Sequence, residues 1–310
     1  MNIPIVDLDL MQGDFDDKQA FANDIGSAFE EFGFVAIKNH LLSKEIQSTL
    51  YETWSSFFNL DLDQKLNYSR PESFFQRGYT PKKSEQAVGF SLADEKEFYH
   101  VGQADDVAEK VDCQFNVWPN EILGLKEVSL SAFSLLEETG LRVMRGIALY
   151  LNLDEGYFDE KLKGGNSILR PIHYYPLIEG EFEEGAVRAG AHTDINFITL
   201  LMGASAAGLE ILKKDGKWMP VTAYGDYLIC NVSDMLQHMT NGKLVSTMHR
   251  VVNGENSGES RFSIPFFMHA KNEVSLRPLD SCIDANNPKK YQDLTAGECL
   301  KERLDQIIKL

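Results

Sequence analysis

The second half of the chain is divided into short apolar runs at regular intervals. From about Ile168 these runs are rich in Ile, Val, Phe, Tyr and Thr, and turn signals such as Asp215-Gly216 and Asn241-Gly242 separate them. β-Branched and aromatic residues favour strands, and Asp-Gly and Asn-Gly pairs favour tight turns. Strands that recur about every eight to twelve residues are typical of a β-sandwich or barrel. This pattern therefore predicts a β core.

The first half mixes helices with strands. Phe21, Ile25, Phe29 and Phe32 recur at the spacing of an amphipathic helix, which Gly33 would end. By the same reasoning we expect strands at 3–6 and 34–37 and helices at about 43–58, 121–151 and 296–308. Ser43 is the expected N-cap of the first of these helices, and Thr295 and Glu298 form the expected capping box of the last. Gly140 is expected to bend or divide the long helix.

The chain has no obvious linker. Its 310 residues contain no Pro/Gly/Ser-rich stretch, low-complexity block or internal repeat. We expect one compact unit with four regions, namely a mixed α/β region at 1–120, supporting helices at 121–165, the β core at 166–275 and a helical segment at 276–310.

Charge and cysteine content exclude some classes of function. A net charge of -17 disfavours binding to nucleic acid or anionic lipid, because both would repel the average surface. We expect neither export nor membrane insertion, because the first residues lack a basic region and a long apolar run, and no later apolar run is long enough for a membrane span. We expect a cytoplasmic protein without an obligate protein partner, and free thiols at the four scattered cysteines Cys113, Cys230, Cys282 and Cys299.

Three residues in the β region suggest a metal site. His192 and Asp194 are two residues apart, a spacing that places both side chains on one face of a strand, and His249 follows in a second β-rich segment. Two histidines and one carboxylate form the facial triad of non-haem Fe(II) oxygenases, which leaves positions open for a chelating keto acid and O2. A structural role is the alternative for any one of these histidines.

Further pairs at the same spacing lie nearby. Arg261 and Ser263 share one face of an apolar strand, and a guanidinium there would bind an anion such as the distal carboxylate of 2-oxoglutarate, the alternative being a structural salt bridge. His173 and Tyr175 form another such pair, although each could equally be a half-buried sheet residue.

In content and in order, these motifs resemble the isopenicillin N synthase-like branch of the Fe(II)/2-oxoglutarate-dependent oxygenases. The similarity covers most of the chain, from Ile3-Pro4-Ile5-Val6-Asp7-Leu8 and Glu31-Phe32-Gly33-Phe34, through Lys96-Glu97-Phe98-Tyr99-His100, Tyr174-Tyr175-Pro176 and His192-Thr193-Asp194, to His249-Arg250-Val251-Val252 and Arg261-Phe262-Ser263.

The resemblance implies a fold and a site. The fold would be a mixed α and β structure whose core is a double-stranded β-helix, or jelly roll, flanked by helices. His192, Asp194 and His249 would bind Fe(II), with Arg261, Ser263 and Tyr175 holding 2-oxoglutarate.

One departure touches this site, because His173 stands where many relatives carry Asn. There it would donate a hydrogen bond to the iron-proximal carboxylate of the keto acid and would add a titratable group. Phe267, at a position that often lines the family's substrate pocket, and Phe74 and Arg77 are candidate substrate contacts. Core packing is the alternative for Phe267, and pairing with a surface carboxylate is the alternative for Arg77.

The resemblance also implies an activity. A 2-oxoglutarate-dependent oxygenase would oxidise an unactivated C–H bond of a small molecule with O2 and would release succinate and CO2. Within the same family, one alternative is an iron oxidase in which the substrate itself ligates iron and needs no keto acid. A second is a non-catalytic metal-binding or sensor protein, or an isomerase, on the same scaffold.

Overall fold

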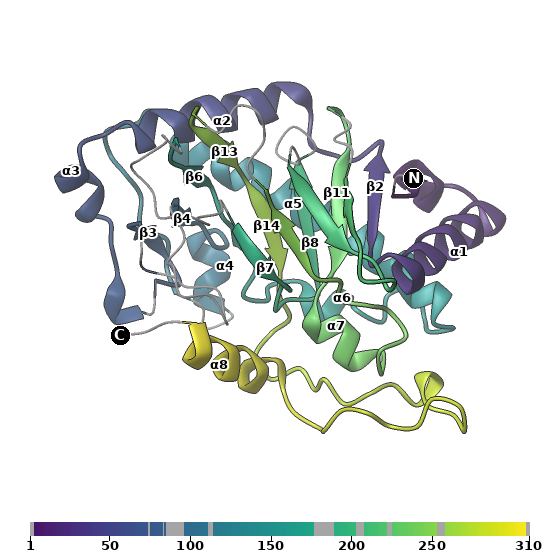
Figure 1. The fold of residues 1–310 in the computed structure, drawn as a ribbon. Helices are drawn as coiled ribbons and strands as arrows, with labels where there is room; N and C mark the ends of the chain where they lie inside the picture. The colour runs from purple at the N-terminus through teal and green to yellow at the C-terminus, as the bar shows by residue number, and fades with distance from the viewer. Residues whose placement is uncertain are drawn as a thin grey trace.

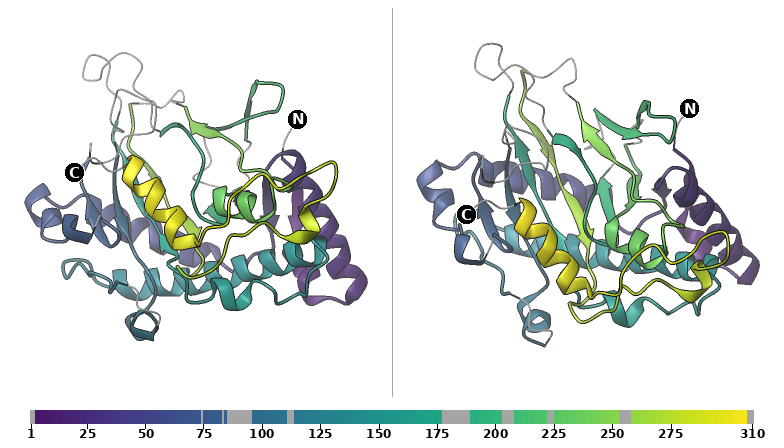
Figure 2. Two further views of the ribbon diagram at one scale, coloured as in Figure 1. Left: turned by 90° about the horizontal axis from the view of Figure 1, so that it is seen from below. Right: turned by 60° about the horizontal axis from the view of Figure 1, so that its bottom comes forward.

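A computed structural model describes residues 3–73, 75–82, 84, 96–110, 114–176, 189–202, 208–221, 225–252 and 258–307. Figure 1 shows strands β14, β8, β11 and β2 side by side in the centre of the molecule, with the C-terminal segment along its lower edge. In both views of Figure 2 the purple, blue and teal helices of the first half form a layer on one side of the strands.

The strands in the described part of the chain form three mainly antiparallel sheets. The first has the order β1 (Ile5–Asp7), β2 (Phe34–Lys38), β11 (Leu228–Val232), β8 (Ile198–Met202), β14 (Pro265–Met268) and β5 (Ile168–Leu169). The second has the order β10 (Trp218–Pro220), β9 (Leu209–Leu212), β12 (His249–Val251) and β7 (Ala189–His192). The third has the order β13 (Arg261–Ser263), β6 (Ile172–Tyr174), β4 (Lys96–His100) and β3 (Gly78–Thr80).

Two segments of the chain run from the first sheet into the third with only a short interruption between their strands. Ile264 alone separates β13 from β14, and Arg170 and Pro171 separate β5 from β6. β13 pairs with β6 in the third sheet, and β14 pairs with β5 in the first. The two segments therefore stay side by side as they run from one sheet into the other. The first and second sheets enclose a small apolar cluster that includes Phe34, Ile211 and Ile229, so they pack face to face. This is the jelly-roll arrangement expected from the sequence.

The helices cover the other face of the first sheet. α5 packs against α1, α2, β8 and β14, and Phe133 of α5 meets Phe266 of β14 edge to face at 5.0 Å. The helical elements are α1 (Phe15–Glu31), α2 (Lys44–Phe58), α3 (Leu62–Leu66), α4 (Asp105–Lys110), α5 (Leu125–Tyr150), α6 (Asp159–Leu162), α7 (Asp234–Met239) and α8 (Ala296–Ile307), with 3₁₀ turns η1 (Leu8–Gln12), η2 (Pro71–Ser73) and η4 (Asp280–Cys282). None of the described helices combines the length and the apolar character needed to cross a bilayer.

Local signals place the helix ends as predicted. The Ser43 hydroxyl accepts a hydrogen bond from the Ile46 amide at the start of α2, and Thr295 and Glu298 form the capping box of α8. Gly33 follows α1 with a φ of 69°, which only glycine adopts at little cost.

Two details differ from the expectations. Gly140 does not divide α5, which is one helix of 26 residues, and a Cβ there would stand 2.7 Å from Sδ of Met268. The glycine therefore allows α5 to approach β14 closely. Asn241-Gly242 ends the short helix α7 instead of joining two strands, since both residues adopt positive φ directly after it.

A buried basic cluster lies where the first and third sheets join. His100 and His269 are 2% and 6% exposed, and the Nε of Arg170 donates to Nε2 of His100 at 2.6 Å. Burial and the charge of Arg170 lower the pKa of His100 well below its usual range. Burial, followed by the charges of Arg170 and Arg77, lowers the pKa of His269 to about 4. Both imidazoles are therefore neutral in the folded protein at neutral pH.

This cluster should make stability depend on pH. Between a pKa of about 4 in the folded chain and about 6.5 in the unfolded chain, His269 binds more proton when unfolded, so the free energy of unfolding falls as pH falls. From about pH 7.5 to 5.5 we expect His269 to contribute a loss of about 1 kcal/mol. Urea unfolding at both pH values measures it. His269→Asn should reduce the difference, and an unchanged difference would contradict the assignment.

Candidate metal centre

The two candidate histidines lie directly opposite each other. His192 ends β7 and His249 begins β12, and these antiparallel strands pair the two residues in register. Their ring centroids are 4.5 Å apart. Nδ1 of His192 donates to the Gly190 carbonyl at 2.7 Å, and Nδ1 of His249 donates to the Thr247 carbonyl at 3.1 Å. Each ring therefore carries its proton on Nδ1 when neutral and leaves the Nε2 lone pair for a metal.

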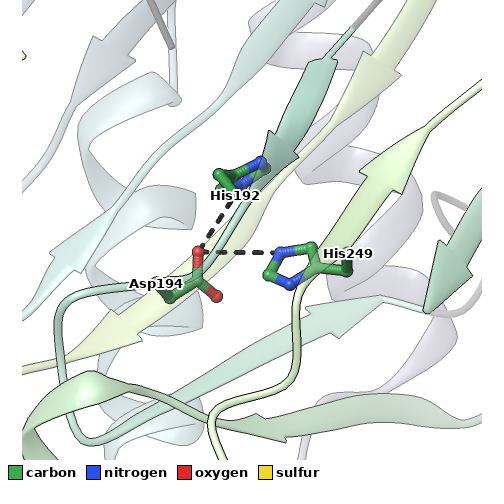
Figure 3. Close-up of side chains that lie close together, drawn as sticks. All are labelled: His192, Asp194 and His249. Carbon is green, nitrogen blue, oxygen red and sulfur yellow. Dashed lines mark ion pairs between the residues drawn. The ribbon is translucent and has the colours of Figure 1, made fainter. Parts of the chain in front are cut away.

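Asp194 completes the group from a different position than expected. β7 ends at His192, so Asp194 lies in the connection to β8 and strand alternation does not set its direction. Hydrogen bonds set it instead, because Oδ2 accepts from the Thr199 hydroxyl at 2.7 Å and from the Asn231 amide at 2.9 Å. Oδ1 is turned towards the histidines, 3.8 Å from Nε2 of each. Figure 3 shows the three side chains pointing toward one another.

The geometry fits one metal ion. One ligand atom from each of His192, Asp194 and His249 lies within 4.8 Å of the others, and they are the residues that the sequence singled out. A first-row divalent ion bound at about 2 Å from each ligand would draw these atoms slightly closer together. Asp194 and His249 are buried, whereas His192 is partly exposed. Two imidazoles and a carboxylate leave further positions on the ion for other ligands.

Electrostatics favour the protonation states that bind metal. Burial by itself would raise the pKa of Asp194, but the His249 and His192 imidazoles and the hydrogen bonds from Asn231 and Thr199 outweigh it and lower the pKa. Desolvation and then the neighbouring His249 lower the pKa of His192. At neutral pH the group therefore offers an ionised carboxylate beside a neutral His192.

Arg261 and Ser263 share a sheet face with a tyrosine. β13 pairs with β6 so that Arg261 lies opposite Tyr174 and Ser263 opposite Ile172, and the Arg261 guanidinium is 5.0 Å from the Tyr174 ring. On the next strand Lys96 lies opposite Tyr174, so it belongs to the same face. Phe98 also lies on this face, and the Arg170 guanidinium is 4.5 Å from its ring and 5.0 Å from the ring of Phe267. Phe267 is opposite Thr199, which binds Asp194, so this face is on the side of the candidate metal centre.

His173 and Tyr175, which the sequence predicted to contact the cosubstrate together with Arg261, lie on the other face of the sheet. His173 is opposite Phe262 on one neighbouring strand and opposite Glu97 on the other, and its ring is 4.7 Å from that of Tyr175. Alternation allows either His173 and Tyr175 or Tyr174 to face inwards. The register of β13 and β4 on β6 places Tyr174, and not His173, on the face that carries Arg261.

Of the candidate substrate contacts, Phe267 is well placed. It lies opposite Thr199 of β8, whose hydroxyl binds Asp194, so its ring is on the metal side of the sheet and is only half-buried. The Arg170 guanidinium is 5.0 Å from this ring and 4.5 Å from the ring of Phe98. Core packing, by contrast, is the role of the adjacent Phe266, which is fully buried.

Arg77 is poorly placed for direct contact with a substrate. It is 1% exposed, donates to Asn166 and to the Gln76 carbonyl at 3.0 and 2.6 Å, and packs against Gly102. Phe74 lies outside the described residues.

Sequence reasoning missed five residues around the centre. Thr199 and Asn231 hold Asp194, whereas Tyr174, Lys96 and Arg170 lie on or near the face that carries Arg261. Arg170 and Tyr174 are four residues apart, so in a continuous strand both would lie on the same face, and placing one on the face of Arg261 would have predicted the other there. Thr199 and Asn231 carry no such signal, because only sheet pairing makes them neighbours.

The chain matches known families and structures along nearly all its length. Residues 3–121 match the N-terminal region described as non-haem dioxygenase in morphine synthesis, and residues 166–270 match the 2OG-Fe(II) oxygenase superfamily. An Aspergillus fumigatus protein named 2-oxoglutarate-Fe(II) type oxidoreductase is 32% identical over 96% of this chain and 91% of its own. The chain belongs to the 2OG-Fe(II) oxygenase superfamily.

Solved structures of relatives agree with this membership. A 2OG-Fe(II) oxygenase family protein from Caulobacter crescentus is 35% identical, with a TM-score of 0.85 over 98% of both chains. A Neurospora crassa protein solved in complex with alpha-KG and thymine is 29% identical, with a TM-score of 0.86 over 98% of this chain and 96% of its own. For this 2OG-Fe(II) oxygenase, the family and the His-Asp-His group together indicate Fe(II), 2-oxoglutarate and O2 as its cofactor and cosubstrates.

The hydrogen bonds to Asp194 should control metal affinity in this oxygenase. Thr199→Val and Asn231→Leu each remove a donor to Oδ2, which frees the carboxylate to rotate, and we expect metal binding to weaken about 10- to 100-fold. Anaerobic Fe(II) titration measures this. Thr139→Val is the matched control, because that buried hydroxyl bonds only within α5, to the Leu135 carbonyl. Unchanged affinity in both site variants would refute the proposed orientation of Asp194.

Proposed function

We propose that this chain is an Fe(II)- and 2-oxoglutarate-dependent oxygenase that oxidises an unactivated C–H bond of a small molecule. For hydroxylation, substrate, 2-oxoglutarate and O2 would become hydroxylated substrate, succinate and CO2. The observation that carries the proposal is the convergence of two imidazole Nε2 atoms and one carboxylate oxygen beside a sheet face that presents Arg261. Desaturation or ring closure would use the same groups with a differently held substrate.

We propose His192, Asp194 and His249 as the iron ligands. When bound, iron would supply the oxidising chemistry that couples O2 to decarboxylation of the keto acid. The chain's own contribution is orientation, since the backbone carbonyls at Gly190 and Thr247 hold the two imidazoles in one tautomer. The hydrogen bonds on Oδ2 of Asp194 direct its other oxygen to the ion.

We propose Arg261 and Ser263 as the clamp for the distal carboxylate of 2-oxoglutarate, with Tyr174 in the role that the sequence suggested for Tyr175. A guanidinium matches a carboxylate with two parallel hydrogen bonds, and a hydroxyl adds one more donor. Tyr174 is supported by its place directly opposite Arg261. Lys96, next in the same row, adds positive charge for a dianionic cosubstrate.

For the substrate we propose contact with Phe267 and Arg170. Both lie on the metal side of the sheet, and the rings of Phe98 and Phe267 hold the guanidinium between them. Phe74 and Arg77 stay candidates from sequence alone, with the burial of Arg77 against a direct role. We also propose a cytoplasmic location and activity without a protein partner, which the free thiols of Cys230, Cys282 and Cys299 support through a reducing environment.

The cosubstrate assignment has a direct test. Anaerobic addition of Fe(II) and 2-oxoglutarate should give a weak visible charge-transfer band, and His192→Ala should lose both the band and bound iron. Arg261→Leu should keep the iron but need about 10- to 150-fold more 2-oxoglutarate, because it loses a charged hydrogen-bonded pair. If His192→Ala keeps the charge-transfer band and its full iron content, the assignment of His192 as an iron ligand is wrong. O2 uptake with substrate but without succinate would favour the oxidase that needs no keto acid.

The substrate-side assignment predicts a different defect. A screen of small metabolites for stimulated succinate release, against a baseline without substrate, would identify a substrate. Phe267→Ala and Arg170→Met should then raise its KM several-fold and increase succinate formed per product, while the 2-oxoglutarate requirement stays within about two-fold. Phe266→Leu, a change in the core on the other side of β14, is the matched control. Normal coupling in both variants would remove these residues from the substrate site.

A further inference from the structure

The outer face of the third sheet carries a buried polar network behind the proposed clamp. Nδ1 of His173 donates to Oε1 of Glu97 at 2.8 Å, and Glu97 also accepts from Lys65 at 2.8 Å and from the Tyr79 hydroxyl. Lys65, Glu97, Tyr79 and His173 are 5%, 0%, 0% and 7% exposed. Figure 1 shows β6 and β13 side by side next to α2, whose Phe58 covers this face.

His173 extends this network to the strand that carries Arg261. Its Nε2 is 3.0 Å from the hydroxyl of Ser260, which immediately precedes β13, and accepts that hydroxyl proton when Nδ1 is the protonated nitrogen. Its ring also stacks on Phe262 at 4.9 Å with an interplanar angle of 16°. One imidazole thus contacts the residue on each side of Arg261 in the chain.

The position of β13 makes such contacts important. β13 has only three residues and, among the described strands, pairs only with β6; beyond that pairing, the one-residue link through Ile264 to β14 holds it. A slip of one residue along β6 would turn Arg261 to the outer face, because side chains alternate along a strand. Cross-strand side-chain contacts add to the link with β14 in opposing such a slip, and His173 supplies two of these contacts.

The composition of the network argues for a role beyond stability. Burying a Lys–Glu pair costs desolvation energy that its attraction barely offsets, and apolar replacements often stabilise a protein more. The pair gives the Glu97 carboxylate a fixed, charged position, and that carboxylate orients the His173 ring. His173 was expected to contact the keto acid directly. Its contacts with Glu97, Ser260 and Phe262 lie instead on the face of the sheet opposite to Arg261.

We propose that Glu97, His173 and Ser260 are positioning residues that hold β13 in register and so aim Arg261 at the cosubstrate. This inference rests on the proposed role of Arg261. It adds that 2-oxoglutarate affinity depends on side chains that never touch 2-oxoglutarate.

Ser260→Ala is the cleanest test, because Ser260 is exposed and its loss removes one hydroxyl without opening the core. With Fe(II) bound and O2 excluded, titration of the charge-transfer band should show 2-oxoglutarate affinity lowered about three- to ten-fold, the size expected for one lost hydrogen bond. His173→Phe, which keeps a ring against Phe262 but loses both hydrogen bonds, should lower it further. Fe(II) affinity should be unchanged in both variants.

A double-mutant cycle separates positioning from general structural damage. In the Arg261→Leu background, Ser260→Ala should have no further effect on 2-oxoglutarate affinity, since it acts through Arg261. The matched control is Ser43→Ala, which removes the N-cap of α2 and should lower the unfolding temperature without changing that affinity.

Each result decides a different point. If Ser260→Ala keeps wild-type affinity, or weakens binding equally with and without Arg261, positioning is overturned while the clamp stands. If Arg261→Leu itself binds 2-oxoglutarate normally, the proposed clamp fails.

Discussion

Antiparallel pairing puts His192 directly opposite His249, and the whole centre depends on this pair. Strand pairing sets the separation of the two rings, and the backbone carbonyl beneath each ring sets its tautomer. The third ligand, Asp194, comes from the first sheet's side of the barrel, where Thr199 and Asn231 hold it. The centre therefore spans two sheets, and face-to-face packing of those sheets is what brings the ligands together.

The third sheet divides its chemistry between its two faces. The inner face carries Arg261, Ser263, Tyr174 and Lys96, which suit a dianionic cosubstrate, and no described strand residue of that face is acidic. Glu97, on the described part of β4, points to the opposite face, where Lys65 and His173 donate hydrogen bonds to it. Because side chains alternate along β4, Lys96 on the face that suits an anion and Glu97 on the opposite face are consecutive residues.

Much of this could be predicted from local signals. Helix caps at Ser43 and Thr295 lie where short-range hydrogen bonding requires them, and apolar periodicity located the main helices. The three candidate ligand residues were also recognisable, because few side-chain sets bind a metal and leave room for other ligands. Asp194 was predicted on a strand and lies beyond its end, since a two-residue spacing describes a strand only where pairing continues.

The sequence by itself determined which residue types were available: two histidines, a carboxylate, an Arg-x-Ser pair and strands short enough to build a jelly roll. Only the tertiary structure decided which of His173, Tyr174 and Tyr175 faces the metal, that Thr199 and Asn231 orient Asp194, and that Arg77 is buried away from direct contact. The physical reason is that side-chain direction alternates with a period of two. A sequence shows that alternate residues of a strand face opposite sides of the sheet. The register between strands distant in the chain is needed to say which of the two sets points inwards.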